Sequence, residues 1–288
     1  MAGLFNLGLI LSAFGGGVFG AALGALNSFI FCGFLVIAGE AISVASGVGS
    51  FTNAIGFGTW FGPHIGFAAG AAAAAYAARK GYVEGRDIIT PLMKFKDPSV
   101  LLVGGLFGIL GYFVNGIIAG VGTPTDTIAL TVVISAIIKR VMFSDTGVIG
   151  TYNPEHGDSR WSPSEDIAWL PFQMHAGELL MIGLGVGLVS SKISLITGSS
   201  FIGFGIAAAS LIILSTIGGS PVTHHIALPA ALAAMATGSV IVGGIFGILG
   251  AFLGEFFARL FYDWGDTHID PPAATIATLT TVVMLFLQ

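Results

Sequence analysis

Long apolar runs separated by short polar stretches extend along almost the whole chain. A helix needs about 20 apolar residues to cross the hydrocarbon core of a membrane, and windows of that length recur throughout. The runs are continuously apolar and lack the two-residue alternation of a membrane-spanning strand. They predict ten transmembrane helices, near residues 7–26, 27–48, 63–80, 99–120, 123–141, 167–190, 195–216, 222–240, 241–262 and 271–287.

Composition supports a membrane environment. The chain has 55% hydrophobic and only 9% charged residues, whereas a soluble domain carries about 25% charged residues on its hydrated surface. We therefore expect an all-α polytopic membrane protein whose main partner is the lipid bilayer, in a prokaryotic inner or plasma membrane. No basic residue precedes the first apolar run, which favours a retained helix over a cleaved signal peptide. The absence of a basic tract argues against nucleic-acid binding.

One long polar stretch, residues 144–166, interrupts the middle of the chain. Near its end, Ser162-Pro163-Ser164-Glu165 combines a capping box with a proline at the first helical position, which predicts the start of a helix. The stretch divides the chain into two halves of similar length. We assign residues 1–143 to a first five-span unit, 144–166 to a polar linker and 167–288 to a second five-span unit.

The two halves resemble each other in sequence. Gly104–Gly111 matches Gly243–Gly250 with one conservative change. Weaker matches follow the same order in both halves, namely Ser28–Ile30 with Ser200–Ile202, Pro63–Ile65 with His224–Ile226, and Thr127–Ala129 with Thr275–Ala277. This shared order predicts an internal duplication. Because five crossings is an odd number, the second copy enters from the opposite face, which predicts two inverted repeats.

The basic residues predict which side of the membrane each loop occupies. With ten spans, nine of the ten Lys and Arg residues fall on one side, in the loops at 79–98 and 142–166, at Lys139 and Arg140 just before the second loop, and at Arg259, and only Lys192 lies opposite. Basic loops prefer the cytoplasm. We therefore expect these loops inside the cell and both termini outside.

Four polar helix starts, related in pairs by the repeat, are the candidate binding site. The first pair is Gly62-Pro63-His64 with Thr223-His224-His225, and the second is Thr123–Thr127 with Asp270–Pro272. Helix N-termini carry unpaired N–H groups and a partial positive charge, and inverted-repeat transporters place such ends near the membrane midplane. Segment 43–62 is too polar and glycine-rich for a lipid-facing helix, which predicts a re-entrant or broken helix lining a cavity.

The predicted substrate-binding residues come from these segments. They are Asn53, Thr59, His64, Thr123, Thr125, Asp126, Thr127, His224, His225, Asp270 and Thr275. Glu40 and Asp126 are candidates for ion coupling, because a carboxylate within a span is costly unless it has a function or a partner. We expect His64 and His225 to be pseudo-symmetric partners that approach one shared site. The simpler alternative, that these residues only cap helices and anchor them at the interface, stays open.

The expected function is a secondary transporter or channel for a small polar or anionic solute bound between the repeats. No catalytic, metal-binding or cofactor-binding motif is present in the sequence, so we expect neither enzyme activity nor a metal or cofactor. Three glycine stripes predict close helix packing, within one chain or in a homo-oligomer. They are Gly16, Gly20 and Gly24; Gly104, Gly108 and Gly111; and Gly243, Gly247 and Gly250. The alternative function is a non-transporting scaffold subunit that packs in a membrane complex through these stripes.

A short fragment, His268–Ala274, is similar to the His-Pro-Pro motif of a small bacterial membrane family associated with nitrite transport. The similarity covers only these residues, and Ile269-Asp270 separates the histidine from the prolines. Chain length and duplication also differ from the four-span plan of that family. The resemblance therefore implies no function for this chain.

Overall fold

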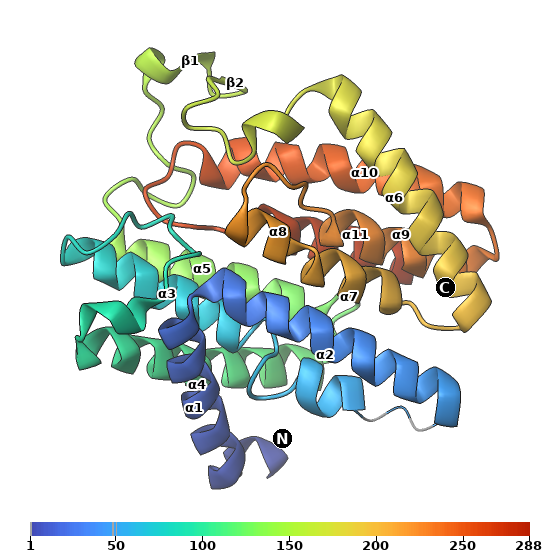
Figure 1. The fold of residues 1–288 in the computed structure, drawn as a ribbon, viewed down its shortest axis with the longest axis horizontal. Helices are drawn as coiled ribbons and strands as arrows, with labels where there is room; N and C mark the ends of the chain where they lie inside the picture. Colours follow the sequence, from blue (N-terminus) through green and yellow to red (C-terminus); the bar gives the residue numbers. More distant parts are fainter. Residues whose placement is uncertain (1, 48, 50) are drawn as a thin grey trace.

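The computed structural model describes residues 2–47, 49 and 51–288. Over these residues the fold is all-α, apart from one small antiparallel hairpin (Figure 1). The helices are α1 Leu7–Leu23, α2 Ala25–Ser46, α3 Gly66–Arg79, α4 Pro98–Gly120, α5 Thr127–Phe143, α6 Ala176–Thr197, α7 Ile202–Ala209, α8 Leu211–Thr216, α9 His224–Thr237, α10 Val240–Phe257 and α11 Pro271–Phe286. The hairpin consists of β1 Gly157–Ser159 and β2 Ser162–Pro163.

Every predicted apolar segment contains a helix, and segment 195–216 contains two, α7 and α8. Four helical segments in the described residues are long and apolar enough to cross a membrane: α2, α4, α6, and α10 with the π-helical turn Ala258–Tyr262 that continues it. Helix α1, the α7–α8 segment and α11 are apolar but shorter. Ten crossings therefore stay a prediction.

The helices form two bundles with the same pattern of contacts. In the first half, α1, α3 and α4 pack against one another, and α5 packs on α3 and α4. In the second half, α6, α9 and α10 pack against one another, and α11 packs on α9 and α10. The bundles meet where α2 packs on α7 and where α5 packs on α11 (Figure 1).

The glycine stripes allow helix backbones to touch inside each bundle. A Cβ atom on Gly17 of α1 would collide with the Gly104 carbonyl of α4, and one on Gly187 of α6 would collide with Gly247 of α10. Within the first bundle, Gly20 lies against the backbone of Gly66. Backbone contact of this kind requires residues without side chains. The predicted stripes on α1, α4 and α10 are therefore used within the chain.

The predicted helix start at the capping box is wrong. Ser162 and Pro163 form strand β2, which pairs with β1. The amide and hydroxyl of Ser164 both donate hydrogen bonds to the carbonyl of His156, at 2.8 and 2.7 Å. The chain at the predicted cap is thus held in a hairpin and does not begin a helix. Helix α6 begins only at Ala176, after the 3₁₀ turn Pro171–Gln173, and not near residue 167.

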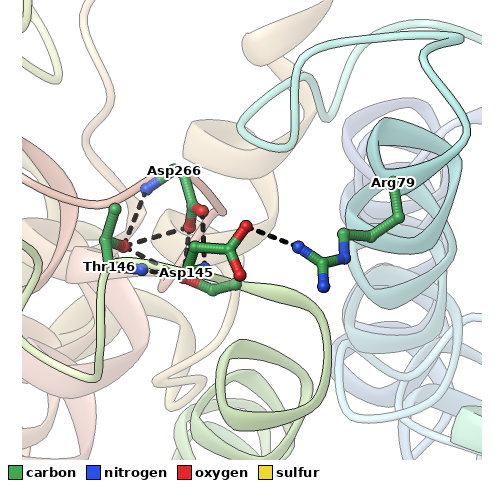
Figure 2. A network of polar contacts seen from close by, with 5 residues as sticks. Arg79, Asp145, Thr146 and Asp266 are labelled. Carbon is green, nitrogen blue, oxygen red and sulfur yellow. Dashed lines mark hydrogen bonds and ion pairs between the residues drawn. The ribbon is translucent and has the colours of Figure 1, made fainter.

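Three loop regions meet at one end of the molecule. Arg79, at the end of α3, forms an ion pair with Asp145 of the linker at 2.5 Å (Figure 2). Asp266, in the connection to α11, accepts a hydrogen bond from the amide of Asp145 at 3.0 Å. Arg86 donates to the carbonyl of Ile167 at 3.0 Å. The loops predicted to share the cytoplasmic side therefore contact one another, while their side relative to a cell stays a prediction.

Candidate functional site

A cavity of about 290 Å³ lies between the two bundles, where α2 meets α7 and α5 meets α11. Its lining comes from α2, α3, α5, α7, α8, α9 and α11 and the loops between them, so both halves contribute. Much of the surface is aromatic, and the rings are Phe29, Phe57, Phe67, Trp169, Phe201 and Phe204. The largest buried apolar cluster of the described residues surrounds this cavity, with Phe29, Phe67, Phe204 and Leu228 among its members.

Four helices begin at the cavity. Pro63 and Phe67 line it at the start of α3, and His224 lines it at the start of α9. Asp126 lines it at the start of α5, and Asp270 at the start of α11. These are the four helix starts that the sequence singles out as two related pairs. The structure brings them to one place.

The start of α3 reaches the cavity because the chain turns back along α2. After α2 ends at Ser46, the π-helical turn Thr52–Gly56 packs on the same helix, where the Cys32 thiol donates to the carbonyl of Gly56 at 3.1 Å. Ser46 and Cys32 are 14 positions apart, or about 21 Å along a helix. Within segment 43–62, Val48 and Ser50 lie outside the described residues. The turn-back agrees with the predicted re-entrant shape, while its depth in a membrane stays a prediction.

Two carboxylates cap two of the four helices. Asp126 accepts a hydrogen bond from the amide of Ala129 at 2.8 Å, and Asp270 accepts one from the amide of Ala273 at 2.8 Å. Acidic caps satisfy free amides and compensate the partial positive charge of a helix start. The N-termini of α5 and α11 therefore already hold an internal anion. The start of α9 differs, because Thr223 forms no side-chain cap there.

Two histidines at the cavity have unpaired ring nitrogens. The His224 side chain packs edge-on against Phe29, with ring centres 4.7 Å apart, and its buried Nδ1 has no hydrogen-bond partner in the described residues. His268 places Nε2 3.1 Å from Asp270 Oδ1, while its buried Nδ1 is also unpaired in the described part of the chain. These residues are 6% and 2% exposed. Leaving a buried polar atom unpaired costs about 1–3 kcal/mol. Ring nitrogens of His64 and His225 are unpaired in the described residues too, but only His224 and His268 line the cavity, where a ligand can supply the missing partner.

The predicted binding residues divide into two groups. Those that line the cavity are Asn53, Asp126, Thr127, His224 and Asp270. The other threonines bond elsewhere: Thr59 to Ser12 at 2.7 Å, Thr123 to the Ile118 carbonyl at 3.2 Å, Thr125 to the Ala277 carbonyl at 2.9 Å and Thr275 to the Pro271 carbonyl at 3.0 Å. The bond from Thr125 joins α11 to the segment before α5, so this residue links the halves and does not face the cavity.

His64 and His225 occupy matching positions, but neither lines the cavity. The carbonyl of His64 lies against Gly111 of α4, and the carbonyl of His225 lies against Gly250 of α10. They are 4% and 0% exposed. Successive residues of a helix point about 100° apart. His224 therefore faces the cavity while its neighbour faces α10.

Glu40 joins the two halves away from the cavity lining. Its carboxylate accepts hydrogen bonds from Thr52 in the π-helical turn, at 2.6 Å, and from Ser199 in the connection between α6 and α7. A role for Glu40 in ion coupling stays a prediction.

Sequence patterns predict no role for His268 or Trp169, although both line the cavity. The spacing His268-Ile269-Asp270 is the signal that could have identified His268, because a residue two positions before a cap lies close to it.

The fold and cavity define an all-α protein with membrane-length apolar helices and a cavity between two similar bundles. The chain belongs to a family of unknown function, DUF7973, whose profile matches residues 1–166 and 158–288. No curated protein and no solved structure matches the chain.

Proposed function

We propose that the protein is an integral membrane transporter or channel that carries a small polar solute through the cavity between its halves. The cavity itself is the observation that carries this proposal. Both halves line it, four helices begin there, and buried imidazole nitrogens beside it have no hydrogen-bond partner in the part of the chain that the structure describes. A mostly apolar pocket with a few convergent polar groups is the usual form of a small-molecule site.

Exposed apolar side chains support a lipid environment. Phe19 of α1, Ile117 of α4, Val189 of α6 and Ile245 of α10 are between 48% and 61% exposed. These helices surround the cavity-lining ones and present large apolar side chains outward. Such surfaces are rare on soluble monomers but ordinary in contact with lipid.

The matching contact patterns support two related repeats, residues 1–143 and 167–288, and the odd number of five crossings in each makes them inverted on this proposal. On this proposal α1 corresponds to α6, α2 to α7 with α8, α3 to α9, α4 to α10 and α5 to α11. Each correspondence preserves the packing partners. Inverted repeats place the binding site at their interface, which is where the cavity lies.

The charges at the cavity favour an uncharged or cationic solute over an anionic one. Asp126 and Asp270 both line the cavity, and its lining, as far as the structure describes the chain, includes neither Lys nor Arg. Aromatic faces and carboxylates together attract cations. A scaffold role is less well supported, because the glycine stripes that it needs are packed inside the chain.

Flux into liposomes containing the purified full-length chain tests the proposal. The panel holds small uncharged, cationic and anionic solutes, each compared with protein-free liposomes. Ala273→Phe or Thr127→Phe places a ring in the cavity and should lower flux at least about tenfold, because the added volume takes the space of the solute. Leu102→Phe, on the exposed face of α4, is the matched control and should leave flux unchanged. Absence of flux across the whole panel, or full flux in both filled variants, overturns the proposal.

A further inference from the structure

The two halves differ at one chemical feature, and that feature lies at the cavity. Asp126 and Asp270 cap their helices in the same way. Two positions before Asp270 stands His268, whereas Pro124 stands two positions before Asp126. In the other pair of helix starts, His224 precedes His225, whereas Pro63 precedes His64. Both cavity histidines therefore belong to the second half, and prolines occupy the matching places in the first.

We propose that His268, Asp270 and His224 form a proton-binding site that couples transport through the cavity to a proton gradient. This inference rests on the proposed transport function. Asp270 Oδ1 lies 3.1 Å from His268 Nε2, and His224 lines the same cavity as these two residues. Imidazole is the side chain whose protonation changes most readily near neutral pH.

The proton balance is simple. When the site holds its proton, His268 is an imidazolium that donates Nε2–H to Asp270, and the pair is neutral. Loss of one proton to water leaves a neutral imidazole beside a carboxylate, and the pair carries one negative charge. The proton that binds from one side of the membrane is the one released to the other. The unpaired Nδ1 atoms of His268 and His224 are positions where a proton can be gained or lost without breaking an existing hydrogen bond.

Other charged groups face this site from the elements packed around it. Lys139 and Arg140 of α5 are each 1% exposed and interact electrostatically with His268. The ring of Tyr262 lies edge-on to His268 at 5.2 Å, and Arg86 lies over that ring. Asp126 is the second carboxylate at the cavity. The pair thus lies between buried cations and a cavity whose described lining has none.

Proton occupancy changes the charge that a solute meets. When the site holds no proton, Asp270 adds a negative charge to the cavity, and a cationic solute is favoured. When the proton is bound, that charge is cancelled. A proton and a cationic solute therefore compete, which is the requirement for exchange in opposite directions.

Nitrogen NMR of histidine-labelled full-length protein in detergent measures proton binding without knowledge of the solute. We follow the rings over a series from about pH 4 to about pH 8 and expect His268 to titrate on the acid side of an ordinary histidine, because burial lowers its pKa. Asp270→Asn keeps the helix cap, because Asn caps as well as Asp, but removes the charge. It should lower the midpoint of His268 by at least about one pH unit. Asp126→Asn is the matched control: it also removes a cavity carboxylate, but Asp126 forms no hydrogen bond to His268 among the described residues, so it should move the His268 midpoint less than Asp270→Asn does. His268→Gln assigns the signal.

Two results overturn the inference: a His268 ring that keeps one protonation state across this range, or an unchanged His268 midpoint in Asp270→Asn. Liposome flux separates this inference from the proposed function. Solute flux that ignores a pH gradient and is unchanged in Asp270→Asn overturns proton coupling and leaves transport standing. Normal titration without flux of any solute overturns transport and leaves proton binding standing.

Discussion

Arg140 is a buried cation that holds the connection to α11 in place. It is 1% exposed and donates to Thr267 Oγ1 and to the carbonyls of Thr267, Val148 and Phe261. A buried charge is tolerated only when its hydrogen bonds are satisfied. The sequence shows Arg140 only as a basic residue near the end of a span. Its partners lie in segments far along the chain, so this role could not be predicted from local pattern.

Arg140→Lys should lower the stability of the protein substantially. Lysine keeps the charge but lacks the planar fork that reaches several acceptors at once, so carbonyls now paired with Arg140 lose their donors. We expect a loss of roughly 2–4 kcal/mol, measured as a fall in thermal midpoint in detergent. Arg79→Lys is the control, because the Arg79–Asp145 pair (Figure 2) is 49% and 79% exposed and such pairs contribute about 1 kcal/mol or less. Equal losses in both variants contradict the prediction.

The raised pKa of Asp263 makes the stability of the folded protein depend on pH. Burial, followed by repulsion from Glu255, raises the pKa of Asp263 from 3.8 to about 7, and its carboxylate accepts the Trp169 amide at 2.9 Å. The folded state therefore holds this proton to higher pH than the unfolded chain does. The contribution of Asp263 to stability falls as pH rises from about 4 to about 7 and is constant above that range, a change on the order of 4 kcal/mol.

Asp263→Asn keeps the acceptor for the Trp169 amide and removes the titration. We expect the variant to match the wild type near pH 4 and to become more stable than it by pH 8, because only the wild type bears a buried negative charge there. Thermal unfolding in detergent at a series of pH values measures this difference. A constant difference across the series would show that Asp263 keeps the same charge throughout.

At the scale of helices, the hydrophobic runs predict which segments are helical, but short sequence matches do not give the residue-by-residue alignment of the two halves. The sequence match aligns Thr127–Ala129 with Thr275–Ala277. The caps instead align Asp126 with Asp270, and hence Ala129 with Ala273, one turn away. Short Thr and Ala motifs recur by chance, whereas a cap fixes where a helix begins. The Ser162–Glu165 error has a similar cause: a four-residue motif is short, and here Ser162 and Pro163 pair with β1 in a hairpin instead.

Paired glycines in α1 and α6 test the backbone contacts between helices. Gly17 and Gly187 have no space for a Cβ atom, while a Cβ atom on Gly15 or Gly185, two positions earlier, would meet nothing within 4 Å among the described residues. Gly17→Ala and Gly187→Ala should each cost about 1–3 kcal/mol, because the crossing helices must separate. Gly15→Ala and Gly185→Ala should be neutral or stabilise by up to about 1 kcal/mol through helix propensity. Thermal midpoints in detergent measure all four, and similar values within each pair would refute the contacts.

For the whole molecule, the sequence predicted that four helix starts belong together, but not which side chains face the cavity. The helices that carry them are apolar on every side, so no polar stripe fixes their rotation. His64 and His225 were chosen from their matching neighbours, and their positions do match. In the structure α9 is turned so that His224, the residue before His225, faces the cavity instead. Packing against Gly111 and Gly250, which lie far away in sequence, decides that rotation.

The orientation of the whole molecule follows from its loops and can be measured with single cysteines. The loop at 79–98 and the linker at 142–166 contact each other at one end of the fold, as Arg79 and Asp145 show, and they carry most of the basic residues, so we expect both in the cytoplasm. The turn after α4 is expected on the opposite side, because α4 is long enough to cross the membrane.

For the labelling experiment, Cys32, which is fully buried, is replaced by Ser to retain its hydrogen bond to Gly56. In that background Lys96→Cys and Ser159→Cys should resist an impermeant thiol reagent in intact cells and react after permeabilisation. Val121→Cys, at a site that is 74% exposed, should react in intact cells. Labelling of the first two but not the third would reverse the orientation, and equal labelling of all three in intact cells would show that α4 does not separate two aqueous sides.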